Sequence, residues 1–338
     1  MTFIDFFAGV GGFTAGLTQA GMNCTGFCEK DKFAVKSYTA IHQPNSRKEW
    51  FCSDITTANS SNVPYADGWT AGFPCQDISV CGRQAGISGE RSGLFYKIVD
   101  LLKGKNPENR PKWLLFENVK NLVSINGGGD FTEILCQISA LGYNIEWQVI
   151  NSKLYVPQNR ERIFIIGHLR TGTERTRQVF PIAGTATKAN TDLIEKVGGM
   201  QGNRVYCSKG ISVCLTAQGG GLGAVTGLYC TGNGGKRCFI DLCVGNPQTT
   251  DIARCIKARY NAGLSNRKAE NSGVLTNGGR VRKLTPRECF RLQGFSDAEF
   301  DRAAAVNSDN QLYKQAGNSV TVPVVREIGE RLIKAYEN

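Results

Sequence analysis

Histidine is scarce in this chain: the 338 residues include two, His42 and His168. The thirteen cysteines contain no C-x-x-C pair. Without such pairs or more histidines, the sequence predicts no metal site. No secretory context supports a disulfide framework, so we expect most of the thiols to be small, buried apolar side chains.

Long apolar runs are also missing. None approaches the roughly 18 apolar residues that a membrane span requires. The N-terminal stretch MTFIDFFAGVGG has no basic region and carries Asp5 among its apolar residues, which does not fit a signal peptide. With 41% apolar residues, the composition is that of a globular protein. We therefore expect a cytoplasmic protein without membrane contacts, with one large core and a second, smaller lobe.

Acidic residues are depleted in one third of the chain. Residues 170–282 hold 6 Asp and Glu against 16 Lys and Arg, whereas the remainder is nearly balanced with 23 against 24. Almost the whole formal net charge of +11 therefore lies in this one segment. A solvated basic face is the simplest interpretation, but a positive charge this concentrated favours a polyanionic partner, most commonly nucleic acid.

The first 169 residues alternate strand-like and helix-like patterns. Apolar runs predict strands, and amphipathic stretches between them predict helices; the strands are expected at 2–7, 22–29, 69–73, 111–118, 143–152 and 162–169, and the helices after Gly12 and at 30–42, 93–104 and 130–142. Strands that alternate with helices of this length predict an α/β fold with a doubly wound, mostly parallel sheet. Ligands bind such sheets at the carboxyl ends of their strands.

The rest of the chain divides into two parts. Residues 170–282 hold 19 of the 40 glycines and an approximate repeat of 211–217 at 252–258, which predicts a smaller lobe rich in strands and loops. From 283 to 338 helical patterns return: Thr285, Pro286 and Glu288 form a capping-box pattern, and 322–336 is amphipathic. We expect this last segment to complete the domain formed by residues 1–169.

A glycine-rich turn follows the first predicted strand in the motif AGVGG. Such a turn lets the backbone approach a ligand closely, although the spacing is not G-x-G-x-x-G. Glu29 ends the second predicted strand about 20 residues later, where an acid binds ribose hydroxyls. Asp54, in the stretch CSDIT, is placed to end a further short strand and to accept a hydrogen bond from an adenine amino group. Each acid alone is explained equally well as a helix cap or a surface carboxylate, but together they favour an adenosine-containing cofactor.

A cysteine follows a proline in the motif GFPCQD, directly after a predicted strand. The reactive form of Cys75 is the thiolate, and a free thiol has a pKa of about 8.5, so its surroundings must favour ionisation. Glu117 ends a neighbouring predicted strand, where burial would raise its pKa and let it donate a proton. Arg160 and Arg162 lead into another strand as residues of one face. This set predicts a nucleophile, an acid and an anion stabiliser at one edge of the sheet.

The motifs DFFAGVGG, GFPCQDIS, ENV, QNRERIF, RKLTPRECFRLQGF and QAGNSV occur in this order and together resemble those of the DNA (cytosine-5) methyltransferases of bacteria and phages. The resemblance covers residues 1–169 and 283–338. It implies a Rossmann-like, S-adenosylmethionine-dependent fold. It also implies that residues 170–282 are a target-recognition domain on double-stranded DNA, which agrees with their charge.

The resemblance further implies a mechanism for this enzyme, a DNA (cytosine-5-)-methyltransferase. Cys75 would add to C6 of a flipped-out cytosine, Glu117 would hold or protonate N3, and Arg162 would bind the O2 side. A methyl group would then pass from S-adenosylmethionine to C5, leaving S-adenosylhomocysteine. The other residues implied in this catalytic set are Arg160, Pro74, Gln76 and Asn118.

The cofactor and DNA sites carry over by motif position. The implied cofactor residues are Phe6, Ala8, Gly9, Gly11, Gly12, Glu29, Lys30, Asp54, Ile55, Pro74, Leu94, Asn318, Ser319 and Val320. The DNA contacts expected from the loop after Cys75 and from basic residues of 170–282 are Ser79, Cys81, Arg83, Gln84, Arg204, Lys209, Lys236, Arg237, Arg254, Lys257 and Arg259. Two positions depart from the pattern: Lys30 stands where a bulky apolar residue often stacks on adenine, and Cys81 where serine is common.

Other functions fit the sequence less well. A transfer-RNA methyltransferase would keep this chemistry, but the 113 residues between the motifs are more typical of a DNA enzyme. An inactive DNA-binding protein of the same fold would not need the complete set of Cys75, Glu117 and Arg162. The sequence lacks the pyrophosphate-binding pattern of a nicotinamide-dependent oxidoreductase. It also lacks the Asn/Asp-Pro-Pro-aromatic tetrapeptide of an amino-methylating DNA enzyme. We expect a monomer, acting within a restriction–modification pair with a separate endonuclease, or as an orphan or phage-borne enzyme.

Overall fold

The computed structural model describes residues 1–44, 49–74, 93–158, 160–170, 177–182, 239–241, 248–250, 272–275 and 281–337. The expected nucleophile Cys75, its neighbour Gln76 and the repeat at 211–217 and 252–258 lie outside these ranges. All the expected DNA contacts do so as well: Ser79, Cys81, Arg83, Gln84, Arg204, Lys209, Lys236, Arg237, Arg254, Lys257 and Arg259.

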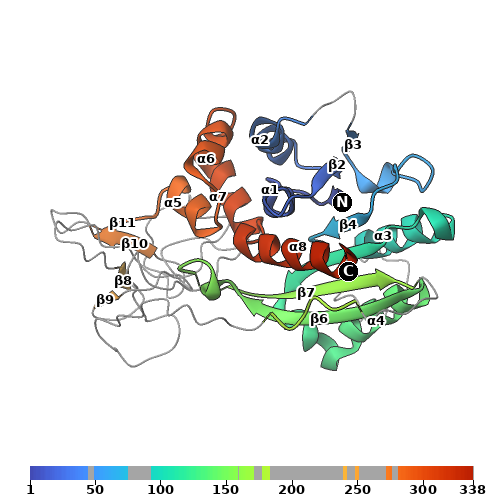
Figure 1. Cartoon of the computed structure of the whole chain (residues 1–338). Helices are drawn as coiled ribbons and strands as arrows, with labels where there is room; N and C mark the ends of the chain where they lie inside the picture. Colours follow the sequence, from blue (N-terminus) through green and yellow to red (C-terminus); the bar gives the residue numbers. More distant parts are fainter. Residues whose placement is uncertain are drawn as a thin grey trace.

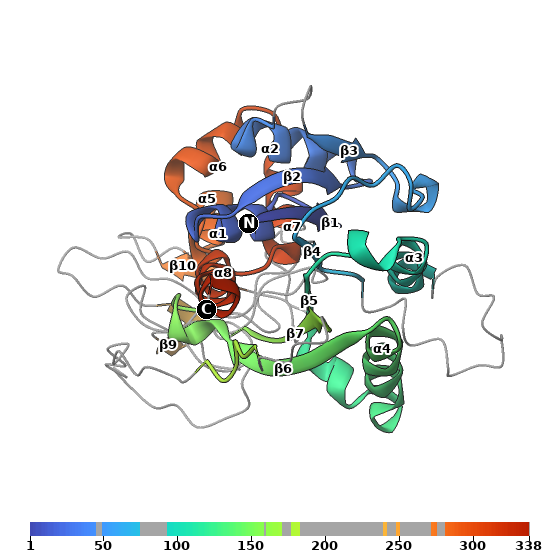
Figure 2. The same ribbon diagram turned by 45° about the vertical axis from the view of Figure 1, so that its right-hand side comes forward.

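A seven-stranded sheet forms the centre of the molecule. Its order is β3 (Trp50–Cys52), β2 (Asn23–Cys28), β1 (Thr2–Phe6), β4 (Gly68–Ala71), β5 (Trp113–Val119), β7 (Glu161–Leu169) and β6 (Tyr143–Asn151). Figure 2 shows this order from β3 at the top to β6 at the bottom. The first five strands are parallel, and β7 is antiparallel to both neighbours. The predicted doubly wound, mostly parallel fold is confirmed.

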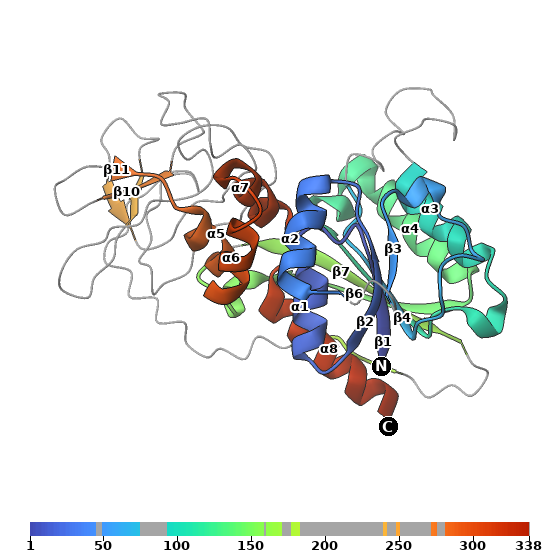
Figure 3. The ribbon, with the colours of Figure 1, turned by 90° about the horizontal axis from the view of Figure 1, so that it is seen from above.

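Helices cover both faces of this sheet. The helices are α1 (Gly12–Gln19), α2 (Lys32–His42), α3 (Gly93–Lys103), α4 (Gly129–Ala140), α5 (Pro286–Leu292), α6 (Asp297–Ala304), α7 (Asp309–Asn318) and α8 (Val322–Glu337). Figure 3 shows α1, α2 and α8 on one face and α3 and α4 on the other. Successive strand residues point to opposite faces, so Phe3 packs with the α1 and α8 side and Ile4 with the α3 and α4 side.

The strand order reverses at β1. The chain runs outward from β1 through β2 to β3, then returns to place β4 on the other side of β1. Such a reversal opens a crevice at the carboxyl ends of the strands, where ligands bind in this architecture. The ends concerned are Phe6 and Ala71, which are paired in the β1–β4 register. The glycine motif and the motif of Cys75 begin directly after these two residues.

The C-terminal helices pack against the N-terminal part of the chain. Helix α8 lies against α1 (Figure 1), and the contact is close because Gly16 has no side chain: a Cβ there would lie 2.6 Å from the Cβ of Val325. Helix α5 begins with the predicted capping box of Thr285 and Glu288. The structure adds α6 and α7, which the sequence patterns did not separate. Among the described residues, no helix is long and apolar enough to cross a bilayer.

Short elements complete the described structure. They are five 3-10 helices, η1 (Ile55–Thr57), η4 (Pro107–Asn109), η5 (Lys120–Val123), η6 (Ile125–Gly128) and η7 (Ser152–Leu154). A second sheet comprises β8 (Phe239–Asp241), β9 (Gln248–Thr250), β10 (Ser272–Leu275) and β11 (Val281–Arg282), in the antiparallel order β11-β10-β8-β9. Within residues 170–282, for which the sequence predicts a lobe rich in strands and loops, the described strands are β8 to β11.

Candidate cofactor and catalytic site

The glycine motif forms a tight turn between β1 and α1. Gly9 and Gly11 have φ values of 57° and 86°, a conformation that glycine adopts without strain. A side chain on Gly11 would collide with the rings of His42 and Tyr38, whereas a Cβ on Gly9 would meet nothing within 4 Å. His42 Nε2 lies 3.1 Å from the Val10 carbonyl oxygen. The turn is therefore closed on its His42 side and open at Gly9.

Glu29 lies across the strand ends from this turn. Its Oε2 accepts a hydrogen bond from the Gly9 N–H at 2.8 Å, and its Oε1 accepts one from the Asp31 N–H at 2.7 Å. Asp31 in turn caps α2 and pairs with Lys314 of α7 at 2.6 Å. The predicted ribose-binding acid is thus held beside the glycine turn, on a loop that the C-terminal segment supports.

Asp54 lies at the end of β3 and caps η1. Its carboxylate accepts hydrogen bonds from the Thr56 N–H at 3.0 Å and from the Thr56 hydroxyl at 2.8 Å. Lys30 Nζ lies 2.7 Å from the other carboxylate oxygen. Hydrogen bonding to Lys30 and then to Thr56 lowers the pKa of Asp54 to about 2. Asp54 is therefore a helix cap, which was one of the two simple explanations for this acid. It is also an ionised hydrogen-bond acceptor near Glu29.

The C-terminal motif approaches the glycine turn directly. A Cβ on Gly12 would lie 2.5 Å from Ser319 Oγ and 2.7 Å from Val320 Cγ2. Asn318 is the last residue of α7, so Asn318, Ser319 and Val320 meet the N-terminus of α1. Of the other expected cofactor residues, Phe6 is buried in the sheet, Ala8 is buried in the turn, Ile55 is buried in η1, and Leu94 lies in the first turn of α3.

Glu117 and Arg162 form an ion pair next to this region. Arg162 Nε lies 3.0 Å from Glu117 Oε1, and both residues are 9% exposed. They meet because β5 and β7 are antiparallel, with Val119 opposite Arg162. In the part of the chain that the structure describes, no donor lies in good hydrogen-bond geometry to Glu117 Oε1, despite this contact. Glu117 Oε2 faces Gly72, where a Cβ would lie 3.6 Å away, so the carboxyl group lies beside the loop that follows β4.

Asn118 connects β5 to the same loop. Its side-chain N–H donates to the Phe73 carbonyl oxygen at 3.0 Å, and its Oδ1 accepts from the Val119 N–H at 2.8 Å. Phe73 is buried, whereas the next residue, Pro74, is exposed. Asn118 therefore anchors the described end of the loop, two residues before Cys75.

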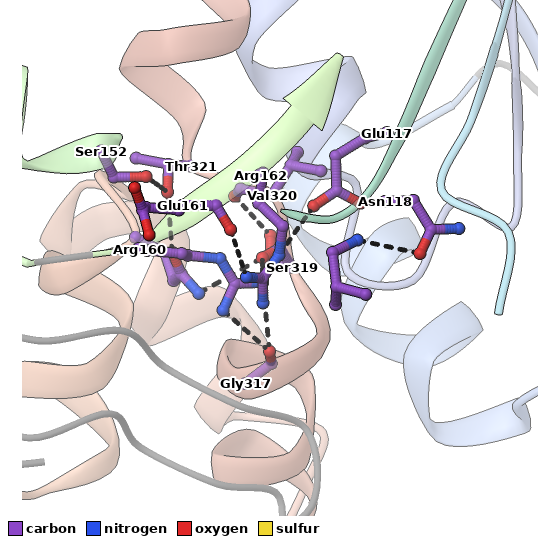
Figure 4. A network of polar contacts seen from close by, with 12 residues as sticks. Glu117, Asn118, Ser152, Arg160, Glu161, Arg162, Gly317, Ser319, Val320 and Thr321 are labelled. Atoms are coloured by element: carbon purple, nitrogen blue, oxygen red, sulfur yellow. Dashed lines mark hydrogen bonds and ion pairs between the residues drawn. The ribbon is translucent and has the colours of Figure 1, made fainter. Parts of the chain in front are cut away.

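Arg160 faces different partners from Arg162, although the two were expected on one face. Its guanidinium donates to the Ser319 carbonyl oxygen at 2.8 Å and to the Gly317 carbonyl oxygen at 3.3 and 3.4 Å (Figure 4). Arg160 is 2% exposed. It precedes the first residue of β7, so the strand alternation does not govern it. The side chain holds the turn after α7, next to the expected cofactor residues.

Sequence reasoning missed a buried polar network around this turn. Gln158 donates to the Leu292 carbonyl oxygen at 2.7 Å, and Gln293 donates to the Ala316 carbonyl oxygen at 2.6 Å. Thr321 lies 2.8 Å from the Ser152 hydroxyl and donates to Gln293 at 3.2 Å. A polar residue that will be buried carries no distinct mark in a single sequence. The one available signal was Gln158, within the QNRER motif.

Asp5 is a second residue that sequence reasoning did not assign. It is fully buried at the centre of β1, and its two oxygens accept hydrogen bonds from the Thr14 hydroxyl at 2.9 Å and the Thr70 hydroxyl at 2.8 Å. Loss of water around the carboxylate raises its pKa to about 7, in spite of these two donors. Asp5 joins β1, α1 and β4 directly beneath the glycine turn.

We expect Asp5→Asn to flatten the pH dependence of stability. The folded-state pKa is raised from 3.8 to about 7, so the stabilising effect of protonation is fully present below about pH 4 and lost as the pH rises through 7. The variant lacks this loss, and relative to wild type its free energy of unfolding should rise between pH 5 and 8 by at most about 3 kcal/mol, since about two pH units of the shift lie in this window. Thermal unfolding of both proteins at pH 5 and 8 measures this. An equal difference at the two pH values would contradict it.

The residues at this crevice fit an adenosine-containing cofactor. The turn at Gly9 leaves room that a side chain would fill, and Glu29 and Asp54 provide two carboxylates at neighbouring strand ends. Carboxylates accept hydrogen bonds from ribose hydroxyls and from an amino group. Among the described residues, no group of three or more His, Cys, Asp or Glu side chains is placed to hold a metal ion.

The fold is the Rossmann-like fold that solved methyltransferases have. Two solved structures have this fold over nearly the whole chain: a Dnmt2 methyltransferase of S. pombe, with a TM-score of 0.64 and 17% identity over 100% of both chains, and a putative DNA modification methyltransferase encoded within an E. coli prophage, with a TM-score of 0.60 and 20% identity over 100% of both. At these identities the likeness concerns the fold.

The family follows from the sequence comparisons. The family of C-5 cytosine-specific DNA methylases matches residues 1–334. The type II methyltransferase M.Bsp6I of Bacillus sp. is 34% identical over 98% of both chains. The orphan methyltransferase M.SPRI of Bacillus phage SPR is 30% identical over 99% of this chain and 98% of its own. The chain belongs to the C-5 cytosine-specific DNA methylase family, and the resemblance given by its motifs is confirmed.

Proposed function

We propose that this protein methylates C5 of specific cytosines in double-stranded DNA, with S-adenosylmethionine as the methyl donor. The observation that carries the proposal is the buried pair of Glu117 and Arg162, which lies at the carboxyl end of β5 beside the loop that leads to Cys75. Family membership supports the reaction, and the carboxylates at the strand ends support the cofactor.

Glu117 and Arg162 have the chemistry to hold a cytosine ring. A buried carboxylate oxygen without a well-aligned donor is costly, and Glu117 Oε1 is such an atom. The amino group of a cytosine can donate to this carboxylate, N3 can bond to it once either group carries a proton, and the guanidinium of Arg162 stabilises charge that develops at O2. Because a stacked base cannot reach a buried pair, the cytosine is flipped out of the duplex.

Cys75 is the proposed nucleophile. Its thiolate adds to C6, which makes C5 electron-rich, and Glu117 supplies or holds the proton at N3 while negative charge spreads over the ring. S-adenosylmethionine, when bound, provides a methyl group on a sulfonium that C5 can attack. Loss of the C5 proton and departure of Cys75 then release 5-methylcytosine. Pro74, Gln76 and the Asn118 contact with Phe73 would position the thiol rather than react.

The cofactor is proposed to lie between the glycine turn and the C-terminal motif. Glu29 would bind the ribose and Asp54 the adenine amino group, with Gly9 and Gly11 giving the close approach. Arg160 would act as a positioning residue, because it fixes the carbonyl groups of Gly317 and Ser319. The remaining contacts proposed are Phe6, Ala8, Gly12, Lys30, Ile55, Leu94, Asn318, Ser319 and Val320.

Residues 170–282 are proposed as the target-recognition domain, with 1–169 and 283–338 together as the catalytic domain. The support is the concentration of 16 basic against 6 acidic residues in this segment, since phosphate neutralisation dominates DNA affinity. The DNA contacts predicted from the sequence stay part of this proposal. We also propose that the enzyme is a monomer and that it methylates DNA without help from an endonuclease.

Bisulfite sequencing of a bacterial host that expresses the protein tests the function. We expect protected cytosines at one short sequence, and a much smaller protected fraction in a host that expresses Glu117→Gln. Methylation found in transfer RNA and absent from DNA would overturn the proposal in favour of the RNA enzyme. Absence of methylation from both DNA and transfer RNA would reject the proposed activity, and the fold would be the only part of the assignment left.

A further inference from the structure

Residues 177–182 are held against the edge of the main sheet by side chains. Strand β6 is the last strand of the sheet, and Glu146 points from it toward this segment. The two oxygens of Glu146 accept hydrogen bonds from the N–H groups of Val179 at 2.8 Å and Phe180 at 2.9 Å. One carboxylate thus takes two consecutive backbone donors, an arrangement with charge-assisted strength.

Gln148 repeats this interaction two residues further along β6. Its Oε1 accepts from the Ile182 N–H at 2.8 Å, and its Nε2 donates to the Ile182 carbonyl oxygen at 3.2 Å. Glu146 and Gln148 lie on the same face of the strand because side chains alternate.

Helix α8 holds the segment from its other side. Arg331 donates to the carbonyl oxygens of Val179 at 3.2 Å and Pro181 at 3.0 Å. Val179, Phe180 and Ile182 are buried in the core that α8 shares with β7. The guanidinium of Arg177 lies 4.5 Å from the centre of the Tyr336 ring. Side chains of β6 and α8 therefore contact three backbone N–H groups and three carbonyl oxygens of this short segment.

His168 connects Glu146 to the end of α8. Its Nε2 lies 2.9 Å from Glu146 Oε1, and its Nδ1 lies 3.1 Å from the Tyr336 hydroxyl. The Tyr336 hydroxyl donates to the Lys112 carbonyl oxygen at 2.7 Å. Glu146 is consequently in contact with two backbone N–H groups of residues 177–182 and with the His168 ring of β7.

We propose that Glu146 is a positioning residue that holds residues 177–182, near the start of the basic segment 170–282, against the catalytic domain. This inference rests on the proposed function, in which that segment binds DNA. A segment whose starting point is fixed loses less conformational freedom when it binds, so the clamp of Glu146 and Gln148 increases DNA affinity without contacting DNA. Neither residue belongs to the proposed cofactor or catalytic set.

Glu146→Gln tests this directly. A glutamine retains one acceptor oxygen, so one of the two amide N–H groups loses its partner. We expect hydrogen exchange at Val179 and Phe180 to become about ten- to a hundredfold faster. We also expect KM for DNA to rise about tenfold, with unchanged kcat and unchanged affinity for S-adenosylhomocysteine. Gln148→Ala, which removes both bonds to Ile182 without a charge change, should act in the same direction. The matched control is Glu133→Gln, an exposed glutamate on α4 that bonds Gln137.

The outcomes separate the clamp from the proposed function. Unchanged amide exchange in Glu146→Gln would overturn the clamp itself. Faster amide exchange with an unchanged KM for DNA would overturn the positioning role. A fall in both kcat and KM, accompanied by a lower melting temperature, would overturn it as well. If wild-type protein methylates no DNA while the exchange still accelerates, the failure lies with the proposed function, and the inference about DNA affinity is rejected with it.

Discussion

Cys75→Ser is expected to reduce methyl transfer by at least about a thousandfold while DNA and cofactor binding persist. A thiol ionises near neutral pH when its surroundings favour the thiolate, whereas a serine hydroxyl does not and needs a base to become a nucleophile. The two side chains are close in size, so the substitution removes nucleophilicity with little change in shape. Addition to C6 is the step that makes C5 reactive, and every later step depends on it.

Single-turnover transfer of labelled methyl groups measures this effect, with DNA affinity measured in parallel. The control is Cys136→Ser, which alters an exposed cysteine on α4 and should leave the rate unchanged. DNA with 5-fluorocytosine at the target should form a denaturant-stable adduct with wild-type protein and none with Cys75→Ser, because fluorine blocks loss of the C5 substituent. Activity above about one percent in Cys75→Ser would reject the nucleophile.

The sheet was predictable because its signals are local. Apolar runs such as that of β1 and β5 end in glycine or polar residues, and amphipathic stretches separate them, so type and order follow from periodicity. The capping box at Thr285 was equally readable. Helix α6 has the same signature in Ser296 and Glu299, but its apolar face is short, with Phe300 and Ala303 as its buried residues, so the pattern did not stand out.

The sequence predicted which residues belong to the site, but it did not predict which partner each of them contacts. Arg160 and Arg162 are alike in sequence, yet one holds the carbonyl groups of the turn after α7 and the other pairs with Glu117. Which partner each finds depends on where β7 begins and on residues more than 150 positions away. Such long-range pairing leaves no periodic trace. The same holds for Glu146, whose neighbours on β6 gave no indication of a clamp.

The buried polar residues show why the C-terminal segment belongs with the N-terminal one. Gln293 and Thr321 would each be costly to bury alone, and their partners lie at Ser152, Ala316 and Gln158. A fully satisfied buried network specifies one arrangement of its elements, since any shift leaves donors or acceptors without partners. The turn with Ser319 and Val320 is thereby held against Gly12.

Glu117→Gln is expected to slow methyl transfer by about 10²- to 10⁴-fold, the range that general acid–base groups contribute. Glutamine neither gives nor takes the proton at N3, and it leaves Arg162 next to a neutral partner, so charge on the ring is less well stabilised. The affinity for S-adenosylhomocysteine should stay within about twofold, because Glu29 and Asp54 lie on other loops. Adduct formation with 5-fluorocytosine DNA should slow in parallel, since addition of Cys75 needs the same proton.

A matched control lies on the same strand as Arg162. Glu161→Gln removes an exposed carboxylate that pairs with Lys120 at 3.0 Å, and a surface pair of this kind contributes at most about 1 kcal/mol. It should leave both rates unchanged. Equal single-turnover rates for wild type and Glu117→Gln would remove the carboxyl group from the chemistry. Slow methyl transfer with undiminished adduct formation would instead assign Glu117 to a step after the addition of Cys75. The 5-fluorocytosine adduct reports formation of the covalent bond, whereas the labelled methyl group reports the transfer.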